Sequence, residues 1–323
     1  MPSKRTKKKP TATKSKKIKK NNRSRQLLKI PVGLIILTVL VLIAGILTHH
    51  MLAKRRPMNR LDNEDGNARA YIPTPQFEIY PEKDIPRPKP KVPTGATPDN
   101  GLPRVAIILD DIGYDRKIVS QFLSLDVPLT LSILPQSPFT KSILAEAQKH
   151  NIEIMLHQPM EPFEYPRANP GPGALLSSMS PDEMLQQFIQ NLDEMPFVSG
   201  VNNHMGSKMT ADSAQMRQLF TVMKQRNLYF IDSRTTEKTI CRRSADLLQL
   251  PFGERDIFID HLQDNEFIET QLRKLVRIAE KHGIAIGIAH PYRRTFKILR
   301  NMMADMKEKV QFVPASEVAQ VSG

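Results

Sequence analysis

The sequence of 323 residues contains no tryptophan and a single cysteine, Cys241. One thiol cannot form an intrachain disulfide, and a chain without clustered cysteines must hold any metal ion with histidine and carboxylate side chains. Acidic residues are absent from residues 1–29, which contain thirteen of the 47 lysines and arginines. The remainder is nearly neutral, with 34 basic and 33 acidic residues. Because the basic tail also lacks aromatic side chains for base stacking, the sequence argues against nucleic-acid binding.

Charged side chains are absent from residues 30–53, a run rich in leucine, isoleucine and valine. This run is long enough to cross a bilayer as a helix. The positive-inside rule then predicts that residues 1–29 are a cytoplasmic tail and that the chain after the helix lies outside the cytoplasm. A cleaved signal peptide is the alternative, but His-His-Met-Leu-Ala-Lys at 49–54 is a poor cleavage sequence. We therefore expect an uncleaved, single-pass transmembrane anchor.

Residues 54–103 form a proline-rich linker by composition. Ten of the 26 prolines lie between Pro57 and Pro103. Proline favours an extended chain that cannot pack a core, so this segment is predicted to tether the following domain to the anchor.

From Arg104 onward, short apolar runs alternate with amphipathic stretches, the pattern of β-α units around a parallel sheet. Ser180, Pro181 and the acidic residues after them predict a helix start there, with the helix continuing to about Glu194. The pattern predicts an α/β domain over 104–323, either an incomplete or distorted (β/α) barrel of about seven strands or an open doubly wound sheet. The strands are expected near 104–109, 128–134, 152–157, 198–203, 228–232, 256–260, 284–289 and 310–313.

Polar residues end most of these apolar runs, where parallel folds place their active sites. Any one of them has an ordinary explanation as a helix cap or a buried, hydrogen-bonded histidine. Together they predict a functional site, because buried ionisable groups are unfavourable unless they are paired or bind a ligand. The strand-end set is Asp110, Asp111, His157, Asn202, Asn203, His204, Asp232, Asp260, His261 and His290.

One carboxylate and two neutral imidazoles form a hydrolytic metal site with an open position for water, and zinc suits such ligands. We assign Asp111, His157 and His204 as the ligands. Asp110 is then the base that removes a proton from metal-bound water, and His290 the acid that protonates the leaving group. Adjacent strand residues point to opposite sides, so both aspartates reach the site only if the strand ends there.

Five motifs around these residues resemble those of the divergent polysaccharide deacetylases, a proteobacterial envelope branch related to the NodB-type carbohydrate esterases. They are Ile-Ile-Leu-Asp110-Asp111-Ile-Gly, Leu-His157-Gln-Pro-Met-Glu161-Pro, Gly-Val-Asn-Asn-His204-Met-Gly-Ser207, Phe-Ile-Asp232-Ser-Arg234-Thr and Gly-Ile-Ala-His290-Pro-Tyr292. The resemblance spans Arg104 to the C-terminus. It implies a distorted barrel, a divalent metal and removal of N- or O-acetyl groups from a polysaccharide, with Asp110 as base, Asp111 as ligand and His290 as acid.

The sequence departs from the NodB pattern at the second histidine ligand. That pattern has two histidines four residues apart, whereas Glu161 stands four residues after His157. Either His204 or Glu161 therefore completes the metal site. For the substrate, we assign Arg234, Tyr292 and Asn203 as contacts.

The expected function is metal-dependent deacetylation of an envelope polysaccharide, either peptidoglycan or an exported glycan. Localisation is expected in the inner membrane, with the C-terminal domain in the periplasm near cell-wall enzymes as partners. Two alternatives remain open: a catalytically inactive barrel that binds a glycan or a protein, and hydrolysis of another bond such as a phosphoester.

Overall fold

The computed structural model describes residues 101–321. The predicted basic tail and anchor lie outside the described residues, as does the linker up to residue 100. Within residues 101–321, every helix is too short or too polar to span a membrane.

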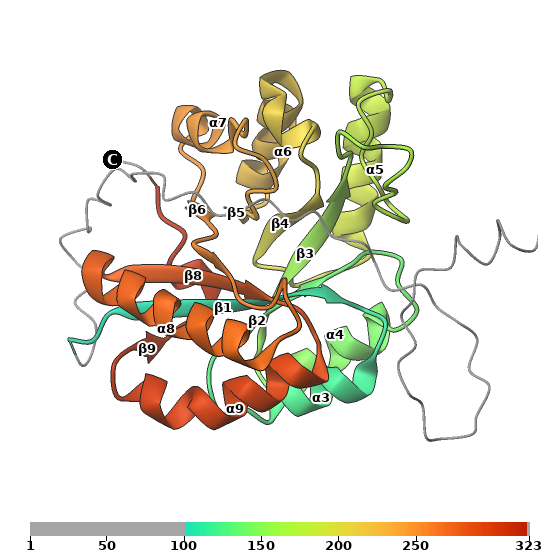
Figure 1. Cartoon of the computed structure of the whole chain (residues 1–323). Helices are drawn as coiled ribbons and strands as arrows, with labels where there is room; N and C mark the ends of the chain where they lie inside the picture. The colour runs from blue at the N-terminus through green and yellow to red at the C-terminus, as the bar shows by residue number, and fades with distance from the viewer. Residues whose placement is uncertain (1–100, 322–323) are drawn as a thin grey trace, which may run out of the picture. The chain divides into compact units, whose positions relative to one another are not determined.

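The domain is built on one sheet of nine parallel strands, with a helix between each pair of successive strands except β6 and β7 (Figure 1). The strand order is β6-β5-β4-β3-β2-β1-β8-β7, and β9 pairs with the start of β1. The strands are β1 Arg104–Ile112, β2 Thr130–Ile133, β3 Glu153–Met160, β4 Gly200–Met205, β5 Tyr229–Asp232, β6 Phe252–Glu254, β7 Ile257–Phe258, β8 Ile284–Ala289 and β9 Gln311–Phe312.

This order is that of a (β/α) barrel from which one pairing is missing. The described residues include no ladder between β6 and β7, so the curled sheet is open there. The predicted distorted barrel is confirmed over the doubly wound alternative, because β1 to β6 follow one another without a reversal of strand order. The helices are α3 Arg116–Leu123, α4 Thr140–Lys149, α5 Pro181–Asp193, α6 Ser213–Gln225, α7 Cys241–Leu248, α8 Asn265–His282 and α9 Arg293–Lys307.

Two apolar clusters lie on the two faces of the curled sheet. On β1, Val105, Ile107 and Leu109 belong to the larger cluster, which includes the buried side chains of the helices. Ala106 and Ile108 belong to a smaller cluster with residues of β3, β5, β7 and β8. This division follows from the two-residue side-chain period of a strand. The side chains of the smaller cluster point to the inner face of the curled sheet. The next inward-facing positions along these strands are polar and form the candidate site described below, so the smaller cluster is the apolar floor of that site.

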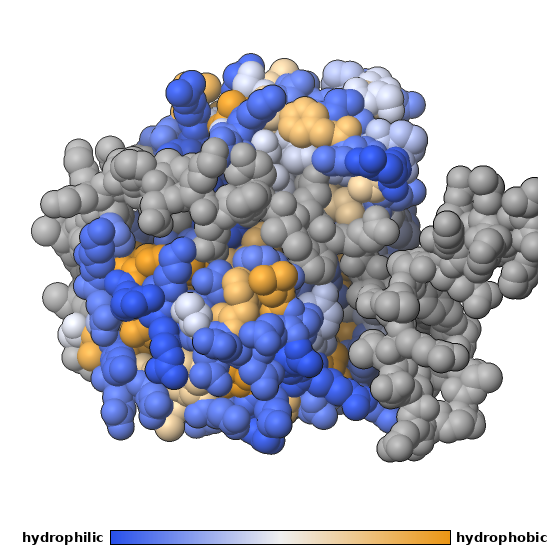
Figure 2. Space-filling model, in the orientation of Figure 1, coloured by the Kyte–Doolittle hydropathy of each residue, from blue (hydrophilic) through white to orange (hydrophobic). Residues whose placement is uncertain are grey.

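The helices cover the sheet with one side and face solvent with the other. Figure 2 shows that the surface over α8 and α9 is mainly hydrophilic, with smaller hydrophobic areas between the polar side chains. An apolar stripe on one side of each helix is what packing against a sheet requires. These helices hold the strand ends in place around the site.

Helix α5 begins as predicted, with Ser180 as its N-cap and Pro181 at the first helical position. The Ser180 side chain accepts a hydrogen bond from the Glu183 amide at 3.3 Å, and the Glu183 carboxylate accepts one from the Ser180 amide at 2.8 Å. This reciprocal pair satisfies two amides at the helix start.

Replacing Ser180 with alanine is expected to lower the free energy of unfolding by about 1 kcal/mol, because the capping acceptor is lost. Chemical denaturation followed by circular dichroism measures the change. Ser178→Ala, at an exposed serine just upstream, is the matched control and is expected to change stability by less than about 0.5 kcal/mol. Equal destabilisation by both variants would contradict the capping role.

Candidate metal and catalytic site

The site is formed by inward-facing residues at the carboxyl ends of β1, β3, β4 and β8. Asp110 continues the inward series of Ala106 and Ile108 on β1. His157 lies two residues after the inward-facing Met155, and His290 two residues after Ile288. The fold therefore gathers side chains that are far apart in the sequence.

Asp111 reaches the same site through an irregularity in β1. Its φ of 56° lies in the left-handed region, and the register with β2 shifts between Leu109 and Ile112. The strand expected near 104–109 continues to Ile112, so both aspartates reach the site without the strand ending there. A local bulge reorients the strand instead and lets both neighbouring aspartates face inward.

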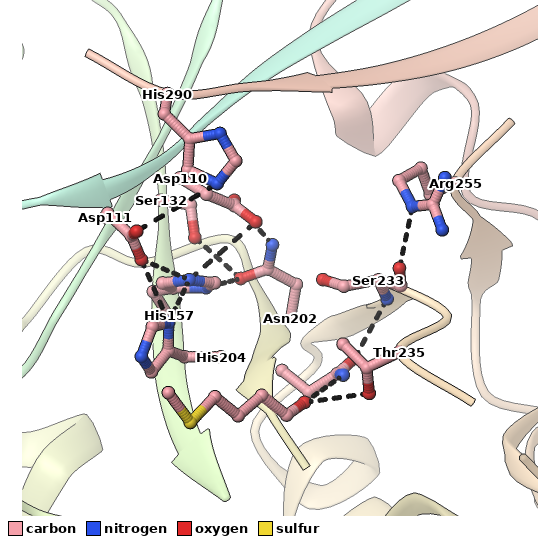
Figure 3. A network of polar contacts seen from close by, with 12 residues as sticks. Asp110, Asp111, Ser132, His157, Asn202, His204, Ser233, Thr235, Arg255 and His290 are labelled. Carbon is pink, nitrogen blue, oxygen red and sulfur yellow. Dashed lines mark hydrogen bonds and ion pairs between the residues drawn. The ribbon is translucent and has the colours of Figure 1, made fainter. Parts of the chain in front are cut away.

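The side chains of Asp111, His157 and His204 converge on one point (Figure 3). Asp111 Oδ1 lies 2.9 Å from His204 Nδ1 and 3.1 Å from His157 Nε2, and the two ring nitrogens are 3.1 Å apart. All three residues are buried. One anionic oxygen and two imidazole nitrogens within 4.8 Å of one another can hold a metal ion, and these donor types fit a divalent cation such as zinc.

Electrostatics keep this cluster charged despite its burial. Burial raises the pKa of Asp111, but His204 and His157 beside it outweigh burial and hold that pKa well below its usual range. For His157, burial lowers the pKa, whereas Asp110 and Asp111 raise it above its usual value overall. The converging charges therefore favour an ionised Asp111, the form that binds cations.

His290 is held in a separate pair with Asp260. Its Nδ1 lies 2.8 Å from Asp260 Oδ1, and its backbone amide donates to Asp260 Oδ2 at 2.8 Å. Thr295 Oγ1 donates to the same Oδ2 at 2.7 Å. Burial lowers the pKa of His290, but Asp260 outweighs it and the pKa rises to about 9. His290 is thus protonated at neutral pH, with its Nε2 directed toward Asp111 Oδ2 at 3.9 Å.

Asn202 and Ser132 complete the network on the other side of His157. Asn202 Oδ1 lies 2.7 Å from His157 Nδ1 and accepts a hydrogen bond from Ser132 Oγ at 2.6 Å. Asn202 Nδ2 donates to Asp110 Oδ1 at 2.8 Å. Asn202, Ser132 and Asp260 had no individual role among the residues predicted for the site. Asn202 and Asp260 were recognisable as strand-end polar residues, whereas Ser132 gave no signal within its apolar run.

The structure joins His204, rather than Glu161, to Asp111 and His157. The Glu161 carboxylate pairs with Lys208 Nζ at 2.8 Å and accepts the Ser177 amide hydrogen. These contacts explain the lowered pKa of Glu161, against which burial acts in the opposite direction. Glu161 therefore ties together the loops beyond β3 and β4.

The three residues assigned to the substrate lie in different settings. The Tyr292 ring is next to His290, with ring centroids 5.8 Å apart. Asn203 is buried, its amide donating to the Met205 carbonyl at 2.7 Å and its oxygen accepting from the Ser233 amide at 2.9 Å. Arg234 has a φ of 52°, and its backbone carbonyl accepts from Arg255 at 3.2 Å. Of these three, Tyr292 is the residue whose ring lies beside His290, the proposed acid.

The fold and the site together define a class: open α/β barrels with a buried carboxylate–histidine cluster at the carboxyl ends of their strands. The chain belongs to the divergent polysaccharide deacetylase family, whose sequence profile matches residues 107–319.

Similar proteins are found in several bacteria. The chain is 29% identical over 215 residues to an uncharacterized protein, YibQ, of Escherichia coli, a match that covers 67% of each chain. It is 29% identical over 210 residues to an uncharacterized protein of Haemophilus influenzae, covering 65% of this chain and 74% of the relative. The structure of an uncharacterized Agrobacterium tumefaciens protein shares the fold, with a TM-score of 0.64, 24% identity and coverage of 70% of this chain and 91% of that one.

Proposed function

We propose that the protein is a metal-dependent deacetylase acting on an envelope polysaccharide, either peptidoglycan or an exported glycan. The observation that carries this proposal is the convergence of Asp111, His157 and His204, with Asp110 and the protonated His290 beside them. Membership of the divergent polysaccharide deacetylase family supports an acetylated glycan as the substrate class.

The cation is proposed to be zinc, held by Asp111, His157 and His204. When bound, it would supply a Lewis acid and lower the pKa of a water molecule. Asp110 lies at the edge of the ligand cluster, with its Oδ2 3.7 Å from His157 Nε2. From there its carboxylate accepts the proton of the water that attacks the acetyl carbonyl.

His290 is proposed to complete the hydrolysis as the general acid. The C–N or C–O bond of the acetyl group breaks, and the departing amine or alkoxide needs a proton. His290 supplies it, since the bond from its Nδ1 to Asp260 leaves Nε2 directed toward the ligand cluster. The products are acetate and the free amino or hydroxyl group of the sugar.

The cellular setting is part of the same proposal. Residues 30–53 are proposed to anchor the chain in the inner membrane, with residues 1–29 in the cytoplasm and the domain from 104 to 323 in the periplasm. The uncharged run and the basic residues before it support this orientation. The linker over 54–103 would place the domain within reach of the cell wall and of enzymes that act on it.

A second candidate is a barrel that binds an envelope glycan or protein without turnover. The burial of the site favours it, because Asp110, His157 and His290 are each 2% exposed. A barrel that only binds a glycan or a protein does not need these buried groups to reach its ligand. Binding without acetate release would identify this function.

The deacetylase proposal is tested by removing and restoring the metal. The full-length chain loaded with zinc is expected to release acetate from N-acetylglucosamine oligomers or from peptidoglycan fragments, measured by an enzyme-coupled acetate assay. Chelation should stop the release and added zinc should restore it, because the cation supplies the Lewis acid. Unchanged acetate release after complete chelation would overturn metal dependence. Glycan binding without any release would favour the second candidate.

A further inference from the structure

Asn202 lies between the proposed base and the proposed metal ligands. It is fully buried on β4, and the β3–β4 register pairs it with His157. Its amide group makes the three hydrogen bonds given above, to Asp110, His157 and Ser132. Figure 3 shows this amide between Asp110 and the His157 ring. One side chain of β4 thereby links residues of β1, β2 and β3.

The chemistry of the partners determines which way the Asn202 amide faces. A carboxylate only accepts hydrogen bonds, so the NH₂ group must face Asp110 and the oxygen must face His157. Ser132 then donates to that oxygen. His157 Nδ1 meets an acceptor and must therefore carry a proton, which leaves the lone pair of a neutral imidazole on Nε2.

The tautomer of His157 decides whether its Nε2 can bind a metal ion. His157 Nε2 faces Asp111 Oδ1 and His204 Nδ1, and it must be unprotonated to bind a cation. A hydrogen bond to the second ring nitrogen of a ligating histidine sets the tautomer and the orientation of the ring. Loss of that hydrogen bond typically weakens metal binding about 10–100-fold.

We infer that Asn202 is a positioning residue that links the proposed base to a proposed metal ligand. Through one amide it orients Asp110 and holds His157 in the tautomer that binds metal. This inference rests on the proposed function for the roles of Asp110 and His157. The neighbouring Asn203 gives a contrast, because both of its hydrogen bonds go to backbone groups.

The first test removes the amide while keeping a similar volume. In the full-length chain, Asn202→Leu is expected to weaken zinc binding about 10–100-fold, measured by competition with a chromophoric chelator. Asn191→Leu is the matched control. Asn191 is also fully buried, but its NH₂ group donates hydrogen bonds to the Gln158 side chain and the Gly173 carbonyl, so its replacement should not change zinc affinity. Equal zinc affinities of Asn202→Leu and the wild type would overturn the inference.

The second test separates the hydrogen bond from Asn202 to Asp110 from the one to His157. It also distinguishes these roles from a general loss of folding. Asn202→Asp keeps an oxygen for His157 and Ser132 but replaces the NH₂ donor with a second carboxylate oxygen against Asp110, so the two carboxylates repel each other or share a proton. Zinc affinity is expected to be retained because His157 Nδ1 keeps its acceptor, whereas kcat for acetate release should fall at least about tenfold, because Asp110 then shares a proton with the new carboxylate and is a poorer base. A purely structural role predicts that metal binding and kcat decline together, so parallel loss would contradict the coupling.

The third readout does not depend on turnover. Nitrogen-15 NMR of the histidine-labelled full-length chain is expected to show a proton on His157 Nδ1, and Asn202→Leu should lose this hydrogen-bonded signal. A wild-type His157 protonated only on Nε2 would overturn the inference even if the enzyme is active. Conversely, a wild type that releases no acetate defeats the deacetylase proposal, while zinc affinity and the Nδ1 proton still decide the role of Asn202.

Discussion

Replacing Asp111 with asparagine is expected to abolish zinc binding and to reduce acetate release to the uncatalysed level. Asp111 supplies the anionic oxygen of the three converging ligand atoms. Asparagine has nearly the same shape but no charge, so two imidazoles remain without a carboxylate to hold the cation. Zinc content by inductively coupled plasma mass spectrometry and the acetate assay measure the two effects on the full-length chain.

Asp115→Asn is the matched control for this prediction. Asp115 lies four residues after Asp111, in the turn after β1, where its Oδ1 caps helix α3 by accepting from the amide of Lys117 at 2.8 Å. Asparagine caps helices about as well as aspartate, so stability, zinc content and activity should persist. A folded Asp111→Asn variant that retains stoichiometric zinc would remove Asp111 from the proposed ligand set.

Replacing His290 with glutamine is expected to lower kcat for acetate release about 10²–10⁴-fold, the usual contribution of general acid catalysis. Zinc affinity should persist, because His290 is not among the three converging ligands. KM should change little if His290 acts on the departing group rather than in glycan binding. Steady-state kinetics and zinc competition on the same preparations separate these quantities.

His150→Gln, at an exposed histidine at the end of helix α4, controls for the substitution itself and should leave kcat unchanged. A wild-type kcat for His290→Gln would exclude His290 as the proton donor. Loss of zinc together with kcat would instead place His290 in the metal site.

Much of the fold follows from local patterns along the chain. Helix α5 begins at the predicted cap, Ser180, and ends within one residue of the predicted Glu194. The strand β6 at Phe252–Glu254 was missed, because three residues are too few for a two-residue period to be recognised. An incomplete barrel was among the expectations, but the position of its opening, between β6 and β7, was not predicted, since strand pairing depends on contacts between distant segments.

The candidate site was predictable to the level of residue type. Side chains that end parallel strands share one edge of the sheet, and this rule pointed to Asp111, His157 and His204. It could not reveal the left-handed φ of Asp111 or the contact of Ser132 with Asn202. Both depend on how β1 and β2 are placed against their neighbours.

The sequence by itself determined the alternating β-α units, the inward and outward faces of the strands, and the family to which the domain belongs. These properties repeat over a few residues and are set by side-chain period and polarity. Only the tertiary structure decided that His204, and not Glu161, meets Asp111 and His157, and that Asn202 joins them to Asp110. Such choices depend on differences of a few ångströms between segments nearly a hundred residues apart, which sheet curvature and strand register control.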